Sequence, residues 1–221
     1  MIAPMTVVAG LDACRSGWVA VVLDDGRFEE ALVGPTFTAV LERLDRASAI
    51  GVDIPIGLPA DDALPRPADG ACRAFVGPRR GSVFPTPPRA ALLASSYAEA
   101  RRVLPSLSAQ SYALRRKILE VDAALTDRVF EVHPEASFAA MGTAPMTHPK
   151  RTWNGLMERR ALLAAAGIEI PGDLPGCDAA ADDVLDAAAV AWTAARKVRG
   201  EARTLPEEPP WDGGRAVAIW Y

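Results

Sequence analysis

The sequence has 221 residues, of which 50% are hydrophobic and 24% charged, and is long enough for one large domain with a sizeable core. Its formal net charge of -4 argues against a surface that is basic throughout. The sequence contains no apolar run of about 18 residues, so no transmembrane helix is predicted. Three cysteines without CxxC spacing argue against a disulfide framework or a zinc site.

The start of the chain, MIAPMTVVAGLDA, lacks the basic segment and the cleavage site of a signal peptide. Its apolar and β-branched residues are instead typical of a strand. These features predict a cytoplasmic protein without a membrane partner.

Periodicity predicts the elements of the first part of the chain. Their order is strand, strand, strand, helix, strand, at residues 6–13, 17–25, 27–34, 37–47 and 49–59. The short polar turns between the first three runs favour two successive antiparallel hairpins. Thr36 is placed to cap the helix, and Pro55 and Pro59 stop the last strand.

The segment of residues 60–127 differs in character from what precedes it. Prolines break its first half into turns, and helices are predicted at 96–104 and 111–125. Because no flexible linker bounds the segment, we expect an insertion that packs over the sheet within a single domain of residues 1–221.

The remaining elements complete an α/β fold with a mixed sheet and flanking helices. We expect a strand at 128–138, a helix at 155–167 that ends at Gly167, an Ala-rich helix at 178–198 and a closing strand at 213–221.

Five carboxylates fall where the sheet and the Ala-rich helix would bring them together. Asp12, Asp53 and Glu131 lie within or at the end of predicted strands, and Asp183 and Asp186 are three residues apart near the helix start. Strand ends at one edge of a sheet gather their side chains, and a helix start can face them. Because such carboxylates would repel one another, we expect a pair of divalent cations, Mg²⁺ or Mn²⁺, which prefer oxygen ligands. All five residues are candidate catalytic groups, and all except Glu131 are candidate metal ligands.

The strand carboxylates also have structural explanations. Asp12 could cap the turn that follows it, and Asp53 could bond the backbone before the next proline. Glu131 could pair with an arginine of the insertion.

The helix carboxylates and their neighbours have alternatives as well. Asp182 and Asp183 could be favourable charges in the first turn of a helix, an explanation that fits Asp186 less well because it lies one turn further in. One of His133 and Glu135 could support a metal ligand, although a hydrogen-bonded structural histidine would look the same in the sequence.

Five blocks of sequence carry a family resemblance: GLDACRSGW, GVDIPIGLP, VGPRRGSVFPTPPR, VFEVHPEASF and DDVLDAAAVAWTAAR, the last followed by a closing AIWY. In this order, over nearly the whole chain, they resemble the family of uncharacterised bacterial proteins described as predicted RNase H-like nucleases. The resemblance implies an RNase H-like mixed five-stranded sheet whose first three strands are antiparallel. The helical and proline-rich insertion after the fourth strand is a departure from ordinary RNase H domains.

The same resemblance implies acidic residues on the first strand, the fourth strand and a late helix. Asp12, Asp53 and the pair Asp183 and Asp186 occupy these places, whereas Glu131 has no superfamily counterpart. The implied activity is divalent-metal-dependent hydrolysis of phosphodiester bonds in a nucleic acid, with two metal ions held by these aspartates.

Positive charge is concentrated in the insertion. Residues 64–120 hold ten basic and three acidic residues, so the rest of the chain carries a net charge of -11. For a nucleic-acid substrate, Arg79, Arg80 and Ser82 of the loop GPRRGS would contact phosphate, and Arg15 is a further candidate. The alternatives are an arginine pair bonded to backbone carbonyls and a solvated helix surface.

Two other classes of function remain open in the sequence. The same strand order serves sugar kinases and actin-like ATPases, in which an Asp on the fourth strand acts as base, but 221 residues leave no room for the duplicated second half of those proteins. A non-catalytic nucleic-acid-binding module is the other alternative. Whether RNA, DNA or a hybrid is bound is open in every case.

Overall fold

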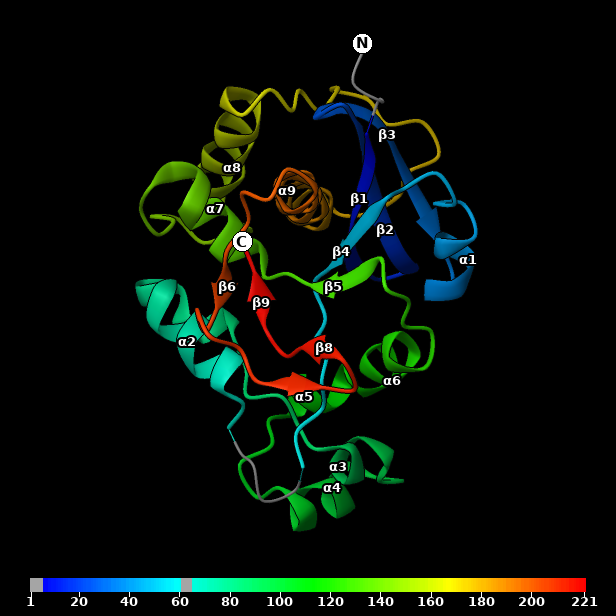
Figure 1. Cartoon of the computed structure of the whole chain (residues 1–221), viewed down its shortest axis with the longest axis vertical. Helices are drawn as coiled ribbons and strands as arrows, with labels where there is room; N and C mark the ends of the chain where they lie inside the picture. Colours follow the sequence, from blue (N-terminus) through cyan, green and yellow to red (C-terminus); the bar gives the residue numbers. More distant parts are fainter. Residues whose placement is uncertain (1–5, 61–64) are drawn as a thin grey trace.

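The computed structural model describes residues 6–60 and 65–221 (Figure 1). Residues 1–5, part of the predicted N-terminal strand segment, and residues 61–64 of the predicted insertion lie outside the described residues. The core is a five-stranded sheet in the order β3-β2-β1-β4-β5. Its strands are β1 (Val7–Cys14), β2 (Gly17–Asp24), β3 (Arg27–Gly34), β4 (Ala49–Val52) and β5 (Val129–Glu131).

The pairing of the strands confirms the predicted fold class. β1 and β2 are antiparallel, as are β2 and β3, so the two predicted hairpins form. β4 runs parallel to β1, and β5 runs parallel to β4. The sheet is therefore mixed, with its first three strands antiparallel.

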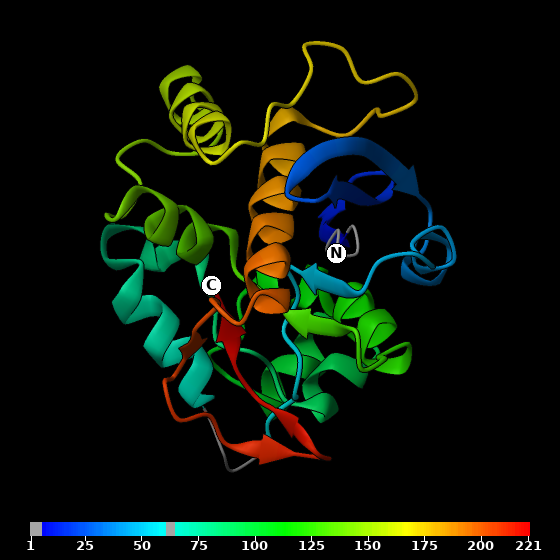
Figure 2. The ribbon, with the colours of Figure 1, turned by 45° about the horizontal axis from the view of Figure 1, so that its top comes forward.

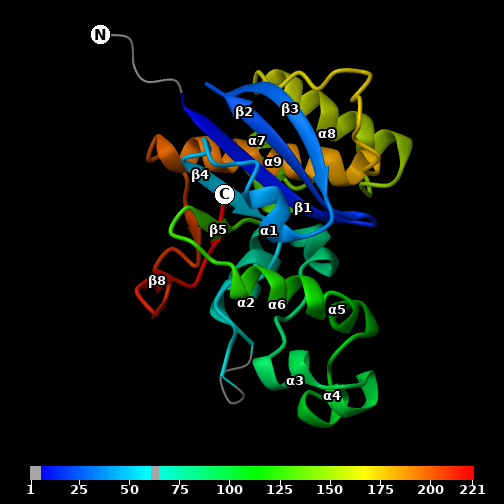
Figure 3. The ribbon, with the colours of Figure 1, turned by 90° about the vertical axis from the view of Figure 1, so that its right-hand side faces the viewer.

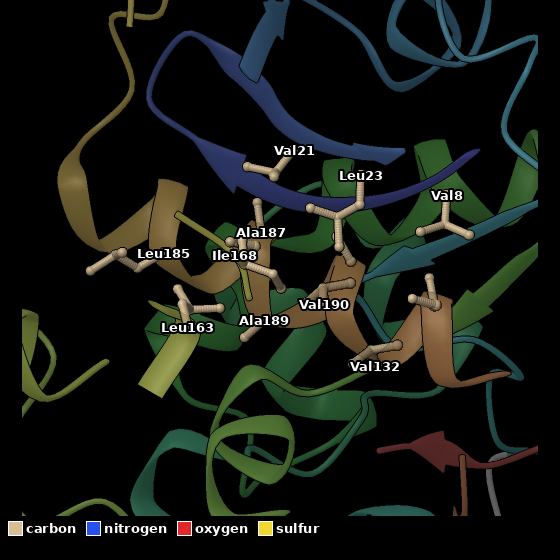
Figure 4. Close-up of a cluster of buried hydrophobic side chains, with 14 of the residues drawn as sticks. Val8, Val21, Leu23, Val132, Leu163, Ile168, Leu185, Ala187, Ala189 and Val190 are labelled. Carbon is tan, nitrogen blue, oxygen red and sulfur yellow. The ribbon is translucent and has the colours of Figure 1, made fainter. Parts of the chain in front are cut away.

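Two hydrophobic cores cover the two faces of the sheet, because alternate residues of each strand point to opposite sides. Val8, Val21 and Leu23 belong to the core beneath helix α9 (Ala181–Val198), which Figure 4 shows. Their neighbours Ala9 and Val22 belong to the opposite core. That second core is closed by the helices α1 (Phe37–Leu41) and α6 (Arg115–Ala123).

Helix α9 lies directly against β1 (Figure 2). Gly10 of β1 makes this approach close: a Cβ at Gly10 would lie 2.1 Å from the backbone nitrogen of Ala191 and 2.2 Å from the carbonyl oxygen of Ala187. The small alanines of α9 allow the same approach from the helix side. The helix backbone is thereby fixed against the first strand, with the helices α7 (Pro134–Gly142) and α8 (Trp153–Ala165) on its other side.

The chain between β4 and β5 forms short helices, which occupy the lower half of Figure 3. They are α2 (Pro67–Phe75), the 3-10 helix η1 (Gly77–Ser82), α3 (Arg89–Leu93), α4 (Tyr97–Val103), α5 (Ala109–Ala113) and α6. The predicted helix at 96–104 is α4, capped by Ser96. The helix predicted at 111–125 is instead divided at Leu114 into α5 and α6. Ile118 and Val121 of α6 anchor this region to the sheet.

Several predicted elements differ in length from those observed. The strand predicted at 49–59 ends at Val52, and the Ala-rich helix predicted at 178–198 begins at Ala181. The first helix, capped by Thr36 as expected, ends at Leu41, after which the chain tightens into turns such as Leu44 N–H to Leu41 O. The strand predicted at 128–138 ends at Glu131, because Pro134 has no N–H for a ladder but fits the first turn of α7.

The helix predicted at 155–167 starts slightly earlier than expected. Thr152 caps it, and its end at Gly167, with φ of 86°, is confirmed.

Among the described residues, no helix is both long and apolar enough to cross a membrane.

The closing strand predicted at 213–221 does not join the five-stranded sheet. Gly213 and Gly214, both with positive φ, turn the chain between the strands β7 (Trp211–Asp212) and β8 (Arg215–Ala216). The last strand, β9 (Ile219–Trp220), pairs with β6 (Thr204–Leu205). An isolated parallel bridge from Trp220 to Val132 connects it to the chain just after β5.

Candidate functional site

Asp12 and Asp53 lie side by side at one edge of the sheet. Leu11 of β1 pairs with Val52 of β4 in the parallel register, so the residue after each occupies the same edge. The backbone N–H of Asp53 donates to the carbonyl of Leu11 at 2.9 Å, which ties the two strand ends together. Both side chains line a cavity of about 250 Å³. The predicted meeting of these two carboxylates therefore occurs.

Helix α9 brings two further carboxylates to the same cavity. Asp183 and Asp186 both line it, Asp186 deeply buried and Asp183 near the rim. The close contact of α9 with β1 at Gly10, one turn further along the helix, sets their position. Asp182, by contrast, pairs with Arg151 at 3.0 Å.

The cavity opposes ionisation of its carboxylates. Burial raises the pKa of Asp12 well above its usual value, and the charges of Asp53 and Asp186 raise it further. Burial also raises the pKa of Asp53 and of Asp186 to about 7, with Glu135 adding repulsion in both cases. Lys150 acts in the opposite direction on all three. A group of negative charges with too little positive charge therefore faces the cavity.

Lys150 lines this cavity as well, beside Arg66 and Arg151, and the sequence did not single it out. Its ammonium donates to Oδ2 of Asp186 and lies 3.9 Å from Oδ2 of Asp182. Burial by itself would lower the pKa of Lys150, but Asp186, Asp12 and Asp53 outweigh burial and raise it. No motif in the sequence indicated this role, since Lys150 lies in an irregular loop between α7 and α8.

Arg79 fixes the loop that carries Lys150. Its guanidinium donates to the carbonyls of Met146, at 2.9 Å, and Thr147. This arginine, proposed from the sequence as a phosphate contact, thus takes the alternative role of binding backbone carbonyls. Glu158 holds the same loop by accepting from the N–H groups of Thr147 and His148 at 2.9 and 3.0 Å.

The other predicted phosphate-binding residues are divided between the cavity and the outer surface. Ser82 lines the cavity, and its hydroxyl donates to the carbonyl of Arg79 at 2.8 Å. Arg80 and Arg15 are exposed and are not among the residues that line the cavity. The structure therefore brings only Ser82 of this set to the aspartates.

Glu131 lines the cavity but is already paired. Arg66 binds it through two parallel hydrogen bonds, each 2.9 Å, and Ile56 N–H donates to it at 2.8 Å. Arg66 also binds Asp69, with Nη2 at 2.6 Å. Burial raises the pKa of Glu131, and Arg66 opposes that rise. Glu131 is therefore half of a buried ion pair, the alternative noted above.

Glu135 is a further carboxylate of the cavity, placed there by the first turn of α7. It is 7% exposed, and its Oε1 accepts from the guanidinium of Arg159. Its Oε2 is buried and has no hydrogen-bond partner among the described residues. His133 caps the same helix by accepting from Glu135 N–H on Nδ1, which leaves Nε2 to carry the proton and face Ser82 O at 3.5 Å. Burial lowers the pKa of His133, so it is a neutral hydrogen-bonding group.

The donor set of the cavity fits a hard divalent cation. Its ligating groups are carboxylate oxygens, the chemistry that Mg²⁺ and Mn²⁺ prefer, and the unpartnered Oε2 of Glu135 lies among them. Within residues 6–60 and 65–221, however, no three His, Cys, Asp or Glu side chains are grouped so that they could hold a metal ion. The carboxylate side chains must therefore move to coordinate a cation together, and the ammonium of Lys150 lies among them.

We expect the free energy of unfolding in metal-free buffer to fall as the pH rises from about 4 to about 7. The pKa values of Asp53 and Asp186 are raised from 3.8 to about 7, so the folded chain binds protons in this interval that the unfolded chain has lost. This contribution to the free energy of unfolding is complete below about pH 4 and is lost as the pH passes 7. Between these values the free energy of unfolding falls by up to about 1.4 kcal/mol per pH unit for each proton.

Urea unfolding at several pH values with a chelator present measures this effect. The difference between wild type and Asp53→Asn isolates the contribution of the cavity, and the exposed Asp45→Asn serves as the control. A pH slope that is identical in wild type, Asp53→Asn and Asp186→Asn would contradict the expectation.

The comparison with protein families gives a match over most of the chain. A family model whose description is "Protein of unknown function (DUF429)" matches residues 10–210. The matched range contains Asp12, Asp53, Lys150 and Asp186. The comparisons with curated proteins and with solved structures gave no match.

Proposed function

The chain belongs to the family described as "Protein of unknown function (DUF429)", and since that description names no activity, we propose a function from the cavity itself. The proposal is divalent-metal-dependent hydrolysis of phosphodiester bonds in a nucleic acid. The observation that carries it is the gathering of Asp12, Asp53 and Asp186 around one cavity in which all three pKa values are raised. Strong shifts of this kind, in several groups of one cavity, are typical of functional sites.

Asp12, Asp53 and Asp186 would hold the cation, with Asp183 at the rim beside them. When bound, Mg²⁺ or Mn²⁺ supplies positive charge to the phosphate and makes a water molecule more acidic. The chain contributes the rigid positions of the aspartates, since two come from paired strand ends and one from a helix packed on β1.

The dimensions and rim of the cavity support a phosphodiester group as the part of the substrate that enters. Its volume of about 250 Å³ is below the range of roughly 300–1,000 Å³ that usually encloses a whole small ligand. Arg151 lines the cavity with its side chain 82% exposed, so it can meet a phosphate at the mouth. These features favour one backbone segment of a polymer over an enclosed nucleotide such as ATP.

A cleavage assay tests this proposal. Single-stranded, duplex, hybrid and branched RNA and DNA are incubated with Mg²⁺, Mn²⁺, Ca²⁺ or excess chelator, beside ATP. We expect at least one polymer to be cut with Mg²⁺ or Mn²⁺, and calcium to support binding without cutting because its coordination is looser. Cutting that persists in chelator contradicts the metal-dependent mechanism. ATP turnover without cutting would favour the kinase-like class, and binding of polymer without either reaction would favour the non-catalytic module.

A further inference from the structure

The ammonium group of Lys150 lies where the cavity needs positive charge. It bonds Asp186, and the charges of Asp12 and Asp53 act on it. We propose that Lys150 is a built-in competitor for the divalent cation, which must displace it from Asp186 in order to bind. This inference rests on the proposed function, because it concerns the cation that the proposed reaction uses.

The charge balance of the cavity makes such a displacement favourable. The Glu135 carboxylate is compensated by Arg159, which donates to it directly. The four aspartates that line the cavity, Asp12, Asp53, Asp183 and Asp186, have one ammonium among them. The ammonium of Lys150 brings one positive charge to this group of aspartates, whereas a divalent cation brings twice that charge to the same position. The ammonium of Lys150 therefore lies beside Asp186 but leaves the negative charge of the other aspartates uncompensated.

The side chain of Lys150 can leave while its loop stays in place. Arg79 and Glu158 bind the backbone before it, and Thr152 begins helix α8 just after it, accepting from Gly155 N–H at 3.1 Å. The lysine side chain itself is 33% exposed and has a flexible four-carbon stem. Its ammonium can thus exchange Asp186 for water, or for a phosphate oxygen at the mouth, by rotation about side-chain bonds.

Amine labelling of the wild-type protein tests this inference directly. The chain has only three lysines, Lys117, Lys150 and Lys197, so acetylation by an N-hydroxysuccinimide ester can be assigned to each by peptide mass spectrometry. We expect Mn²⁺ to raise the labelling rate of Lys150 by about threefold or more, because release from Asp186 frees the amine from its ion pair and exposes it to the reagent. Lys117 and Lys197, which contact Trp18 and Trp220, are internal controls whose rates should not change.

A matched pair of variants supplies an independent measurement, the dissociation constant for Mn²⁺ by calorimetry. Lys150→Gln should bind Mn²⁺ at least about tenfold more tightly than wild type, because the competing charge is gone. Arg151→Gln removes one positive charge from the adjacent residue, which pairs with Asp182 at the rim, and should change the constant by less than about threefold.

The outcomes separate this inference from the proposed function. Tighter binding by Lys150→Gln together with increased labelling of Lys150 supports the inference. If wild type binds Mn²⁺ but neither the labelling of Lys150 nor the affinity of Lys150→Gln changes, the inference is overturned and the proposed function stands. If wild type and both variants bind no Mn²⁺ or Mg²⁺, both are overturned.

Discussion

Asp12→Asn, Asp53→Asn and Asp186→Asn should each lower metal-dependent cleavage by about a thousandfold or more. The three carboxylates face one cavity and would share the same cations, so the loss of one removes the function of the others. For the same reason the double variant Asp12→Asn with Asp53→Asn should be little worse than either single one, as for other groups that act as a unit. Initial rates with Mg²⁺ and with Mn²⁺ on the best substrate measure these effects.

Folding of the variants can be checked independently of activity. Each Asn variant should unfold at the same or a higher temperature than wild type at about pH 8, because a buried negative charge with insufficient compensation has been removed. Asp45→Asn, an exposed change of the same kind, should leave both cleavage and unfolding unchanged. Full activity in Asp12→Asn would contradict the proposed mechanism.

Arg66→Met should lower the free energy of unfolding by about 3–5 kcal/mol. Arg66 is 2% exposed and binds both Glu131 and Asp69, so its loss leaves two buried carboxylates without their cation. The free energy of unfolding in urea at neutral pH measures the effect. The loss should shrink at about pH 4, where Glu131, whose pKa is raised by burial, can take up a proton instead.

Arg89→Met is the matched control for this change. Arg89 pairs with Asp122 at 2.7 Å, but its side chain is 54% exposed, and such surface pairs contribute about 0–1 kcal/mol. Equal losses in Arg66→Met and Arg89→Met would show that the buried pair with Glu131 is not a main source of stability.

The sequence sufficed for the parts of the fold and site that depend on local pattern. Short apolar runs separated by polar turns predicted β1, β2 and β3, and a strand ending in an acidic residue correctly located Asp53 next to Asp12. Helical spacing placed Asp183 and Asp186 on one helix, near its start. These inferences succeed because strand order and helix faces follow from periodicity within a few residues.

What the sequence could not supply depends on contacts between distant segments. The sequence offered a pairing of Glu131 with an arginine of the insertion as an alternative, but it did not identify Arg66, 65 positions away. The pair of Lys150 with Asp186, 36 positions apart, was not anticipated. Nothing in the composition near Lys150 distinguishes it from a solvated surface lysine. The strand predicted at 213–221 is instead interrupted by the turn at Gly213 and Gly214, and its last residues form β9, which pairs with β6.

The close approach at Gly10 means that the two sides of the cavity differ in stiffness. Between β1 and α9 there is backbone against backbone at this point, so no layer of side chains can compress or repack to alter the separation of Asp12 from Asp186. The opposite wall is a loop, and its lysine reaches the aspartates only through rotatable bonds. Substitutions elsewhere in the core should therefore leave the distance between Asp12 and Asp186 unchanged. Small changes in the loop should instead alter how close the charge of Lys150 lies to these aspartates.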